Sequence, residues 1–214
     1  MIHTYGEQSS AALLLKFHDL LSALKIEDAE RIDFAYKVLL QHYKIISENL
    51  TPGPHQRNIL KRVTLEGNEI STYSREKFSS VRQIALGNEA IRTHPDNLFH
   101  ICPSGFHLYA VSEDGTVLTS KNPIPISALL LGRNPGGFTH AHLVEDFDLS
   151  VRSSGEIVCA KTQERLHGII ITNRSGHFQP SRSALNKVIP IIATSFGLHR
   201  SKIFPLAVDR EPRN

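Results

Sequence analysis

The sequence predicts an α+β fold, in which an N-terminal helical pair is followed by a mostly antiparallel sheet with helices packed on it. Two observations carry this prediction. The first 50 residues repeat apolar side chains at helical spacing, whereas short apolar runs alternate with turn signals between residues 95 and 172. The 214 residues are 40% hydrophobic and 21% charged, an ordinary globular composition, so a chain of this length can bury a real core.

Two amphipathic helices are expected at the N-terminus. Residues 10–24 place Leu13 and Phe17 on one helical face. A second helix should run from Glu27 to Asn49, with acidic residues at its start that suit the helix dipole. An amphipathic pair of this kind is either a partner-binding surface or part of the core, and core is the commoner use.

A proline- and glycine-rich segment at residues 51–54 ends the helical part. We therefore divide the chain into an N-terminal helical part, residues 1–50, and an α+β core, residues 55–214. The core carries a run of polar motifs between residues 138 and 180, and the chain has no internal repeat.

The core should begin with a hairpin. Its strands hold Arg62–Leu65 and Ile70–Tyr73, and residues 66–69 form the turn. A helix should then open at Ser74 and stop at Gly87.

Strands should predominate after Pro95. They are expected at residues 98–101, 108–111, 116–119, 138–144, 156–160, 168–172 and 203–208. The apolar segment 124–131 is broken by Pro125. A helix is expected over residues 181–196, kinked or split at Pro190 and ended by Gly197.

Composition and charge narrow the functional classes. The net charge of +3 comes from scattered Lys and Arg without interleaved aromatics, so no nucleic-acid partner is expected. Cys102 and Cys159 are too few for a disulfide framework and are interpreted as buried free thiols. No apolar run of about 18 residues or signal-like N-terminus is present, which predicts no membrane span and a protein that is cytoplasmic, or secreted without a cleaved signal peptide.

We interpret the stretch from Ile169 to Pro180 as the segment around which the functional site is organised. A buried strand, residues 169–172, is broken at residues 173–176, and His177 follows at its exit. Ser181 or Ser183 can cap the helix that comes next. A bend between a rigid strand and a rigid helix exposes side chains, as many functional sites require.

A second group is His140 and His142. On a strand these two imidazoles point to the same face, about 7 Å apart, and can share a metal or a polar ligand. His177 or Asp146 could supply a third ligand. The alternative, which we favour, is a pair of hydrogen-bonded histidines on a half-buried sheet face, and we expect no bound metal.

The third group is Ser153-Ser154-Gly155-Glu156. Gly155 permits close backbone approach and Glu156 should begin a strand, although an ordinary surface turn has the same composition. No glycine-rich phosphate loop, His-Glu-x-x-His helix or nucleophile elbow accompanies it. Neither cysteine has a context that would activate it as a nucleophile.

The segment from Phe138 to Pro180 resembles the core signature of the plant IQ-motif-containing calmodulin-binding proteins and of related bacterial toxin and effector domains. That signature reads Phe-x-His-Ser-Ser-Phe, then Ala-Ala-Gly-x-Leu, then Ser-Gly-His-Tyr-x-Pro. Here Phe138 and His140 stand in place, whereas Ala141 and His142 replace the two serines.

The rest of the signature follows in order. Ser153–Ile157 stands for the Ala-Ala-Gly stretch. Ser175–Pro180 matches the last motif best, with Phe178 in place of Tyr. The calmodulin-binding helix of the plant proteins lies outside this signature, so calmodulin binding does not carry over.

The resemblance implies an effector- or toxin-like enzyme, similar in outline to NAD-dependent ADP-ribosyltransferases. His140 would then hold NAD, Glu156 would be the acid that stabilises the developing oxocarbenium charge, and His177 would shape the pocket. The residues this implies for NAD binding are His142, Ser153, Ser154 and Ser175. The expected partners are a small-molecule ligand and a host or target protein.

The alternative is a non-catalytic module that binds a ligand or a protein through the same residues. The change of His-Ser-Ser to His-Ala-His favours this alternative slightly. The intact Ser-Gly-His-x-x-Pro motif favours a working site.

His177 provides the test that the sequence itself generates. A His177→Ala protein should keep its thermal midpoint and lose ligand binding or activity, because the Gly176 bend frees this imidazole from the strand. Thermal unfolding with and without NAD measures both properties. Loss of several degrees of stability with unchanged ligand binding would show that His177 only holds the strand–helix junction.

Overall fold

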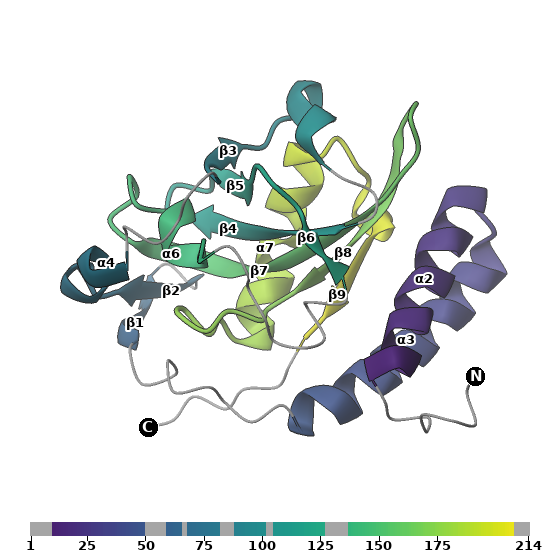
Figure 1. The fold of residues 1–214 in the computed structure, drawn as a ribbon, viewed down its shortest axis with the longest axis horizontal. Helices are drawn as coiled ribbons and strands as arrows, with labels where there is room; N and C mark the ends of the chain where they lie inside the picture. The colour runs from purple at the N-terminus through teal and green to yellow at the C-terminus, as the bar shows by residue number, and fades with distance from the viewer. Residues whose placement is uncertain are drawn as a thin grey trace.

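The computed structural model describes residues 10–49, 59–65, 68–81, 88–101, 105–126 and 137–207. Within these residues the chain forms two N-terminal helices and one nine-stranded, mostly antiparallel sheet with further helices packed on it (Figure 1). The α+β prediction is therefore confirmed.

The N-terminal helices are α2, Ser10–Ile26, and α3, Ala29–Asn49. Between them Glu27 adopts a left-handed φ of 58°. Asp28 caps α3, because its Oδ1 accepts the Arg31 N–H at 3.0 Å. The two helices predicted from apolar spacing are thus present, and the acidic residues lie where the second helix starts.

The apolar stripe of the helical pair is part of the core. Leu13, Phe17 and Leu24 are buried in one cluster with Val158 and Phe204 of the sheet. The interpretation of the stripe as core, rather than as a partner-binding surface, therefore holds for these residues. Residues 10–49 share their hydrophobic core with the sheet.

The first part of the core domain follows the expected hairpin and helix, with one correction. Its elements are β1 Ile59–Leu65, β2 Asn68–Tyr73, α4 Arg75–Val81, β3 Ala90–Arg92 and the 3₁₀ helix η3 Pro95–His100. β1 and β2 pair antiparallel. The prediction of a strand at residues 98–101 is wrong, because His94 caps a helical turn that begins with Pro95. Of the predicted turn, residues 66–69, Asn68 and Glu69 belong instead to β2, whereas residues 66–67 and the predicted stop at Gly87 lie outside the described residues.

The remaining strands are β4 Gly105–Ser112, β5 Val117–Ser120, β6 Ile124–Pro125, β7 Ser150–Lys161, β8 Leu166–Thr172 and β9 Ile203–Leu206. Five of the nine strands, β4 to β8, therefore lie between residues 95 and 172, where most were expected. The part of segment 124–131 beyond Ile126 lies outside the described residues.

The helix after the bend is α7, Arg182–Ser195. Ser181 caps it by accepting the Ala184 N–H, and Gly197 ends it with a φ of 62°. The helix continues through Pro190 as one element, so of the two expected outcomes, a kink or a split, the split does not occur. A 3₁₀ turn, η4 Arg200–Lys202, leads into β9.

The sheet is built around β7. The main strand order is β1-β2-β7-β4-β5-β3, while β8 also pairs with β7 and β9 pairs with β8. All pairs are antiparallel except β8 and β9, which are joined through α7. β9 forms one edge of the sheet. The Tyr36 hydroxyl of α3 donates to the carbonyl of Pro205 in β9 at 2.8 Å, so α3 covers this edge.

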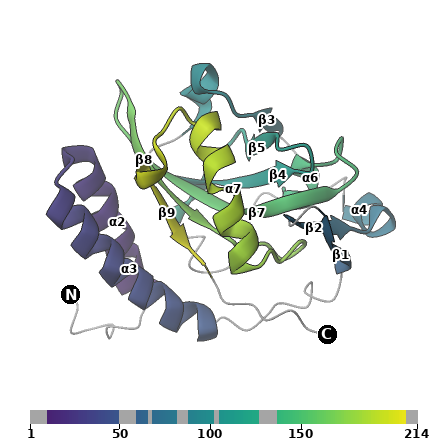
Figure 2. The same ribbon diagram turned by 180° about the vertical axis from the view of Figure 1, so that it is seen from behind.

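Helices cover both faces of the sheet. On one face α2 joins the larger core cluster. On the other face α7 packs with Ile157, Ile171, Leu185 and Val188 in a second cluster, and Figure 2 shows α7 lying across the sheet. The site residues discussed below lie in and over the central strands between these layers.

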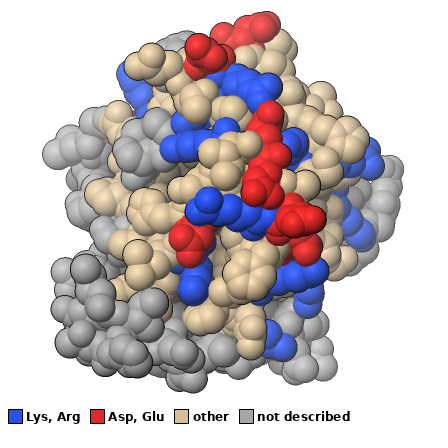
Figure 3. All heavy atoms as spheres, turned by 90° about the vertical axis from the view of Figure 1, so that its right-hand side faces the viewer, with Lys and Arg blue, Asp and Glu red and all other residues tan. Residues whose placement is uncertain are grey.

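The exposed side of the helical pair carries mixed charges. Figure 3 shows Lys and Arg side chains interleaved with Asp and Glu on the described part of this face. Arg165 binds Glu27 at 2.5 Å and holds the pKa of that carboxyl below its ordinary value, and Lys37 binds Asp33 at 2.6 Å. Among the described residues, no helix is long and apolar enough to cross a membrane.

Two expectations about the motif run are wrong. Residues 138–144 were expected as a strand, but α6, His140–Leu143, is a single helical turn started at Thr139. Successive residues of a helix point about 100° apart, so His140 and His142 do not share a face. Glu156 does not begin a strand, because it lies in the interior of β7.

Gly155 should be the least replaceable glycine of the sheet. A Cβ at this position would lie 2.0 Å from the Thr172 carbonyl oxygen, so Gly155→Ala must force two strands apart. We expect the free energy of unfolding to fall by about 2 kcal/mol or more in urea denaturation. Gly176→Ala is the matched control, because nothing lies within 4 Å of its Cβ position. Equal effects of the two substitutions would contradict this packing.

Candidate functional site

The candidate site lies along one edge of β7, at the point where pairing with β2 ends and pairing with β8 begins. Along that edge β2 pairs with residues 150–151 and β8 pairs with residues 157–161. Between these pairings the end of β8 approaches β7 closely, and Gly155 leaves the room for the Thr172 carbonyl. The side chains around this gap carry the polar groups of the site.

Thr172 holds Glu156 in place. The Thr172 hydroxyl donates to Glu156 Oε2, while the backbone N–H groups of Glu156 and Arg174 donate to Thr172 Oγ1 at 3.1 and 3.2 Å. Glu156 is only 6% exposed, so its carboxylate depends on protein donors. One hydroxyl therefore fixes both the backbone and the carboxylate of Glu156.

Tyr109 contacts Thr172 from the face of the sheet opposite to Glu156. Its hydroxyl donates to the Thr172 carbonyl at 2.9 Å. Burial raises the pKa of the Tyr109 phenol far above its ordinary value, so the hydroxyl keeps its proton. The sequence analysis missed both residues, because Thr172 ends one apolar run and Tyr109 lies inside another.

His140 is brought against the same segment. Its ring is 6% exposed, and Nε2 lies 2.9 Å from the Gly155 carbonyl oxygen. A carbonyl only accepts hydrogen bonds, so Nε2 carries the proton in this contact. The contact fixes the tautomer of His140 and holds it one residue from both Ser154 and Glu156.

Ser154 differs from its neighbours in its hydrogen bonding. Its side chain is fully buried, and its hydroxyl has no hydrogen-bond partner among the described residues. An unsatisfied buried hydroxyl costs about 1–3 kcal/mol. Ser154 and Glu156 lie two residues apart on β7 and so share a face. A polar group of a ligand or a water would satisfy this hydroxyl.

Two predicted binding serines lie elsewhere. Ser153 points to the opposite face of β7 from Ser154, where its Oγ lies 3.4 Å from the Tyr109 hydroxyl. Ser175 shapes the turn after β8, because its Oγ accepts the Phe178 N–H at 3.3 Å. Their side chains contribute to the frame of the site rather than to the group around Glu156.

His177 is on the turn between β8 and α7, where the sequence places it. Its ring is half-buried and meets the Tyr73 ring edge-on, with 4.8 Å between centroids. Phe178 is fully buried in the larger core cluster and fixes the turn. His177 thus borders the site from the β2 side of β7, because Tyr73 ends β2.

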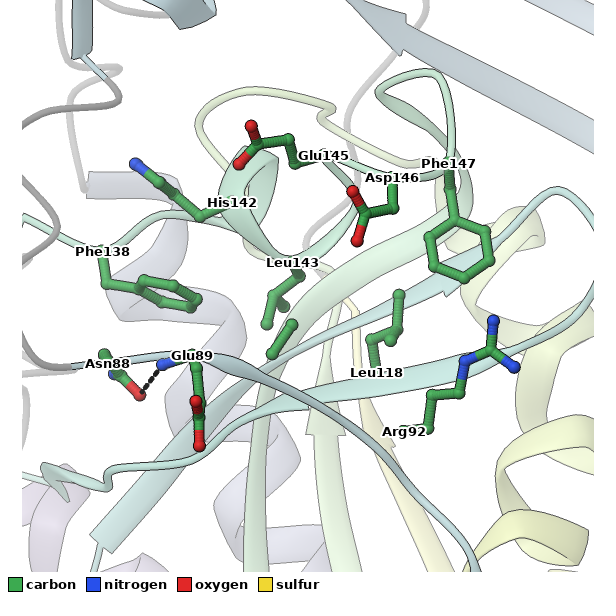
Figure 4. Close-up of a pocket in the computed structure, with 11 residues that line it drawn as sticks. Asn88, Glu89, Arg92, Leu118, Phe138, His142, Leu143, Glu145, Asp146 and Phe147 are labelled. Carbon is green, nitrogen blue, oxygen red and sulfur yellow. Dashed lines mark hydrogen bonds between the residues drawn. The ribbon is translucent and has the colours of Figure 1, made fainter.

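His142 faces a different space. Its Nδ1 accepts the Thr139 N–H at 3.0 Å, and its ring packs between Phe78 and Phe138. Together with residues of β3, β5 and the turn after α6, it lines a cavity of about 500 Å³. Figure 4 shows this cavity. Its lining residues are Asn88, Glu89, Ala90, Arg92, Leu118, Phe138, His142, Leu143, Glu145, Asp146 and Phe147.

A buried histidine of β4, His107, is structural. His107 has Nδ1 2.7 Å from the Ser120 carbonyl oxygen. Burial lowers the pKa of His107 to about 4, so the ring stays neutral near pH 7. Among the described residues, no three His, Cys, Asp or Glu side chains gather closely enough to hold a metal ion.

Comparison of the chain with protein-family models, with curated proteins and with solved structures found no match. The resemblance of residues 138–180 to the IQ-motif-containing proteins and their bacterial relatives therefore stays a prediction.

Thr172→Val tests whether one hydroxyl holds the site together. The substitution keeps the branched shape of the side chain but removes the hydroxyl that bonds the Glu156 carboxylate and the N–H groups of Glu156 and Arg174. The free energy of unfolding should therefore fall by about 2 kcal/mol. Thr194→Val is the control, because that hydroxyl bonds the Pro190 carbonyl on the exposed side of α7. Denaturant unfolding measures both, and indistinguishable losses would contradict the role given to Thr172.

Proposed function

We propose that this chain is an effector- or toxin-like enzyme of the ADP-ribosyltransferase type, with Glu156 as its acid. One observation carries the proposal: the buried carboxyl group of Glu156, held by Thr172, lies two residues from Ser154, whose hydroxyl has no hydrogen-bond partner among the described residues, and His140 contacts Gly155 between them. Buried polar groups are costly in a core, and titratable ones gather at functional sites. The signature between residues 138 and 180 includes His140, and the similarity in outline to ADP-ribosyltransferases assigns the acid to Glu156.

In this proposal NAD supplies an ADP-ribosyl group, whose transfer breaks the bond between the ribose and nicotinamide. A positive charge develops on the ribose as that bond breaks. The Glu156 carboxylate stabilises it strongly, because a desolvated and already oriented anion needs no reorganisation. Glu156 also orients the acceptor group of a host or target protein.

The neighbouring residues would hold the donor. His140 presents a ring whose orientation the Gly155 contact fixes. The Ser154 hydroxyl offers a buried hydrogen bond to a polar donor group, which its lack of a partner within the described residues favours. His177, packed on Tyr73, shapes the border of the site.

The cavity beside α6 does not suit NAD. Glu89, Glu145 and Asp146 line it with carboxylates, against one guanidinium from Arg92. The pyrophosphate of NAD carries two negative charges, and the single guanidinium can pair with only one of them while the carboxylates repel both. We therefore place NAD at the Ser154–Glu156 side of α6 and not in this cavity, although His142 was expected to bind it.

A non-catalytic binding module is the second candidate. His140 already bonds the Gly155 carbonyl, and Ser175 already shapes a turn, so both have roles in the frame itself. The cavity beside α6 can hold a ligand without involving Glu156. This candidate predicts binding without turnover.

Glu156→Gln separates the two candidates. Glutamine keeps an oxygen that accepts the Thr172 hydroxyl but removes the charge, so release of nicotinamide from NAD should fall at least about a hundredfold. The readout is nicotinamide release and transfer of labelled ADP-ribose, with the thermal midpoint as a check of folding. Glu113→Gln, on the exposed β4–β5 turn, is the control. Wild-type protein that binds NAD without turning it over would support the binding module, and turnover unchanged in Glu156→Gln would remove Glu156 from the mechanism.

A further inference from the structure

The cavity beside α6 is a second site with its own chemistry. Its volume of about 500 Å³ falls in the range of small-molecule pockets, and it does not include His140, Ser154 or Glu156. Leu118, Phe138 and Leu143 form an apolar wall. Polar side chains from two separate segments, β3 and the turn after α6, complete the lining (Figure 4).

Arg92 supplies the positive charge of this lining. Its guanidinium carbon lies 5.5 Å from the centre of the Phe147 ring, which holds the side chain by a cation–π contact. Stacking on a ring leaves the N–H edges of a guanidinium available for a carboxylate. Within the described part of the chain, the Arg92 guanidinium makes no ion pair and donates no hydrogen bond, although its charge helps to lower the pKa of the Asp114 carboxyl.

Asp146 supplies a negative charge to the same cavity. Figure 4 shows its carboxylate directed from the turn after α6 toward Leu118, while Arg92 lies beneath Phe147. No ion pair or side-chain hydrogen bond engages Asp146 within the residues described. Glu89 differs, because it binds Lys121 at 2.6 Å. Arg92 and Asp146 thus line one cavity with opposite charges and do not neutralise each other by contact.

We propose that this cavity binds a small zwitterion with an apolar body, of the class of free α-amino acids. The ligand carboxylate binds the guanidinium of Arg92, the ligand ammonium binds the carboxylate of Asp146, and the apolar body lies on Leu118, Phe138 and Leu143. A ligand with both charges pairs with both groups, whereas a simple cation or anion pairs with only one of them.

The test uses three probes of the same apolar body. L-Phenylalanine carries both charges, phenethylamine lacks the carboxylate and 3-phenylpropionate lacks the ammonium. Calorimetric titration of the full chain should detect phenylalanine, with each single-charge analogue about tenfold weaker or worse. Arg92→Gln should weaken phenylalanine and phenylpropionate but spare phenethylamine. Asp146→Asn should weaken phenylalanine and phenethylamine but spare phenylpropionate.

Matched controls keep the charge changes comparable. Arg200→Gln and Asp148→Asn remove the same charges outside the cavity and should leave phenylalanine binding unchanged. The inference is overturned if phenylalanine does not bind, if a single-charge analogue binds as tightly, or if neither cavity variant affects binding. Nicotinamide release from NAD reports on the Glu156 site separately, so this inference and the proposed enzyme activity can fail independently.

Discussion

The fold depends on how β7 is shared among its neighbours. One edge of this strand pairs with β4 from Val151 to Val158, while the other edge pairs first with β2 and then with β8. Two strands cannot occupy the same length of edge, so the backbone between the two pairings must find other hydrogen-bond partners. At the end of β8 the Thr172 hydroxyl supplies one such partner, because it accepts the Glu156 N–H. The change of neighbour therefore creates a position where side chains, rather than a strand ladder, satisfy the backbone.

The same position explains why polar residues accumulate in an otherwise apolar layer. Glu156 and Ser154 face the side of the sheet that α2 and the larger core cluster cover, and His140 reaches the Gly155 carbonyl from α6. Each of these groups takes part in holding the backbone or adjoins one that does. A site built in this way is rigid, because moving Glu156 would also break the contacts of Thr172. Its rigidity suits the stabilisation of a developing charge better than the capture of ligands of varied shape.

Much of the fold, and less of the site, could be predicted from the sequence. Apolar spacing located α2, α3 and α7, and β-branched runs located β8, because these elements repeat a pattern over several turns or residue pairs. The single turn of α6 escaped, since four residues are too few to show a period and its start depends on Thr139 and His142 contacting each other. The motif order predicts that His140, Ser154 and Glu156 lie together, and the structure places His140 against Gly155, the residue between the other two. Thr172 was not identified, because its importance comes from a register between β7 and β8 that no local pattern records.

The shared core of the helical pair and the sheet bears on how the chain reaches its fold. Leu13 and Phe17 of α2 are buried in one cluster with Val158 of β7 and Phe204 of β9. Among the described strands, β9 is the last to be synthesised. During synthesis the apolar side of the helical pair must wait uncovered while more than a hundred residues follow it. Contacts so distant in sequence slow folding and leave such a surface open to association with other chains. The position of the final strands in the sheet thus determines how long this apolar face stays uncovered during synthesis.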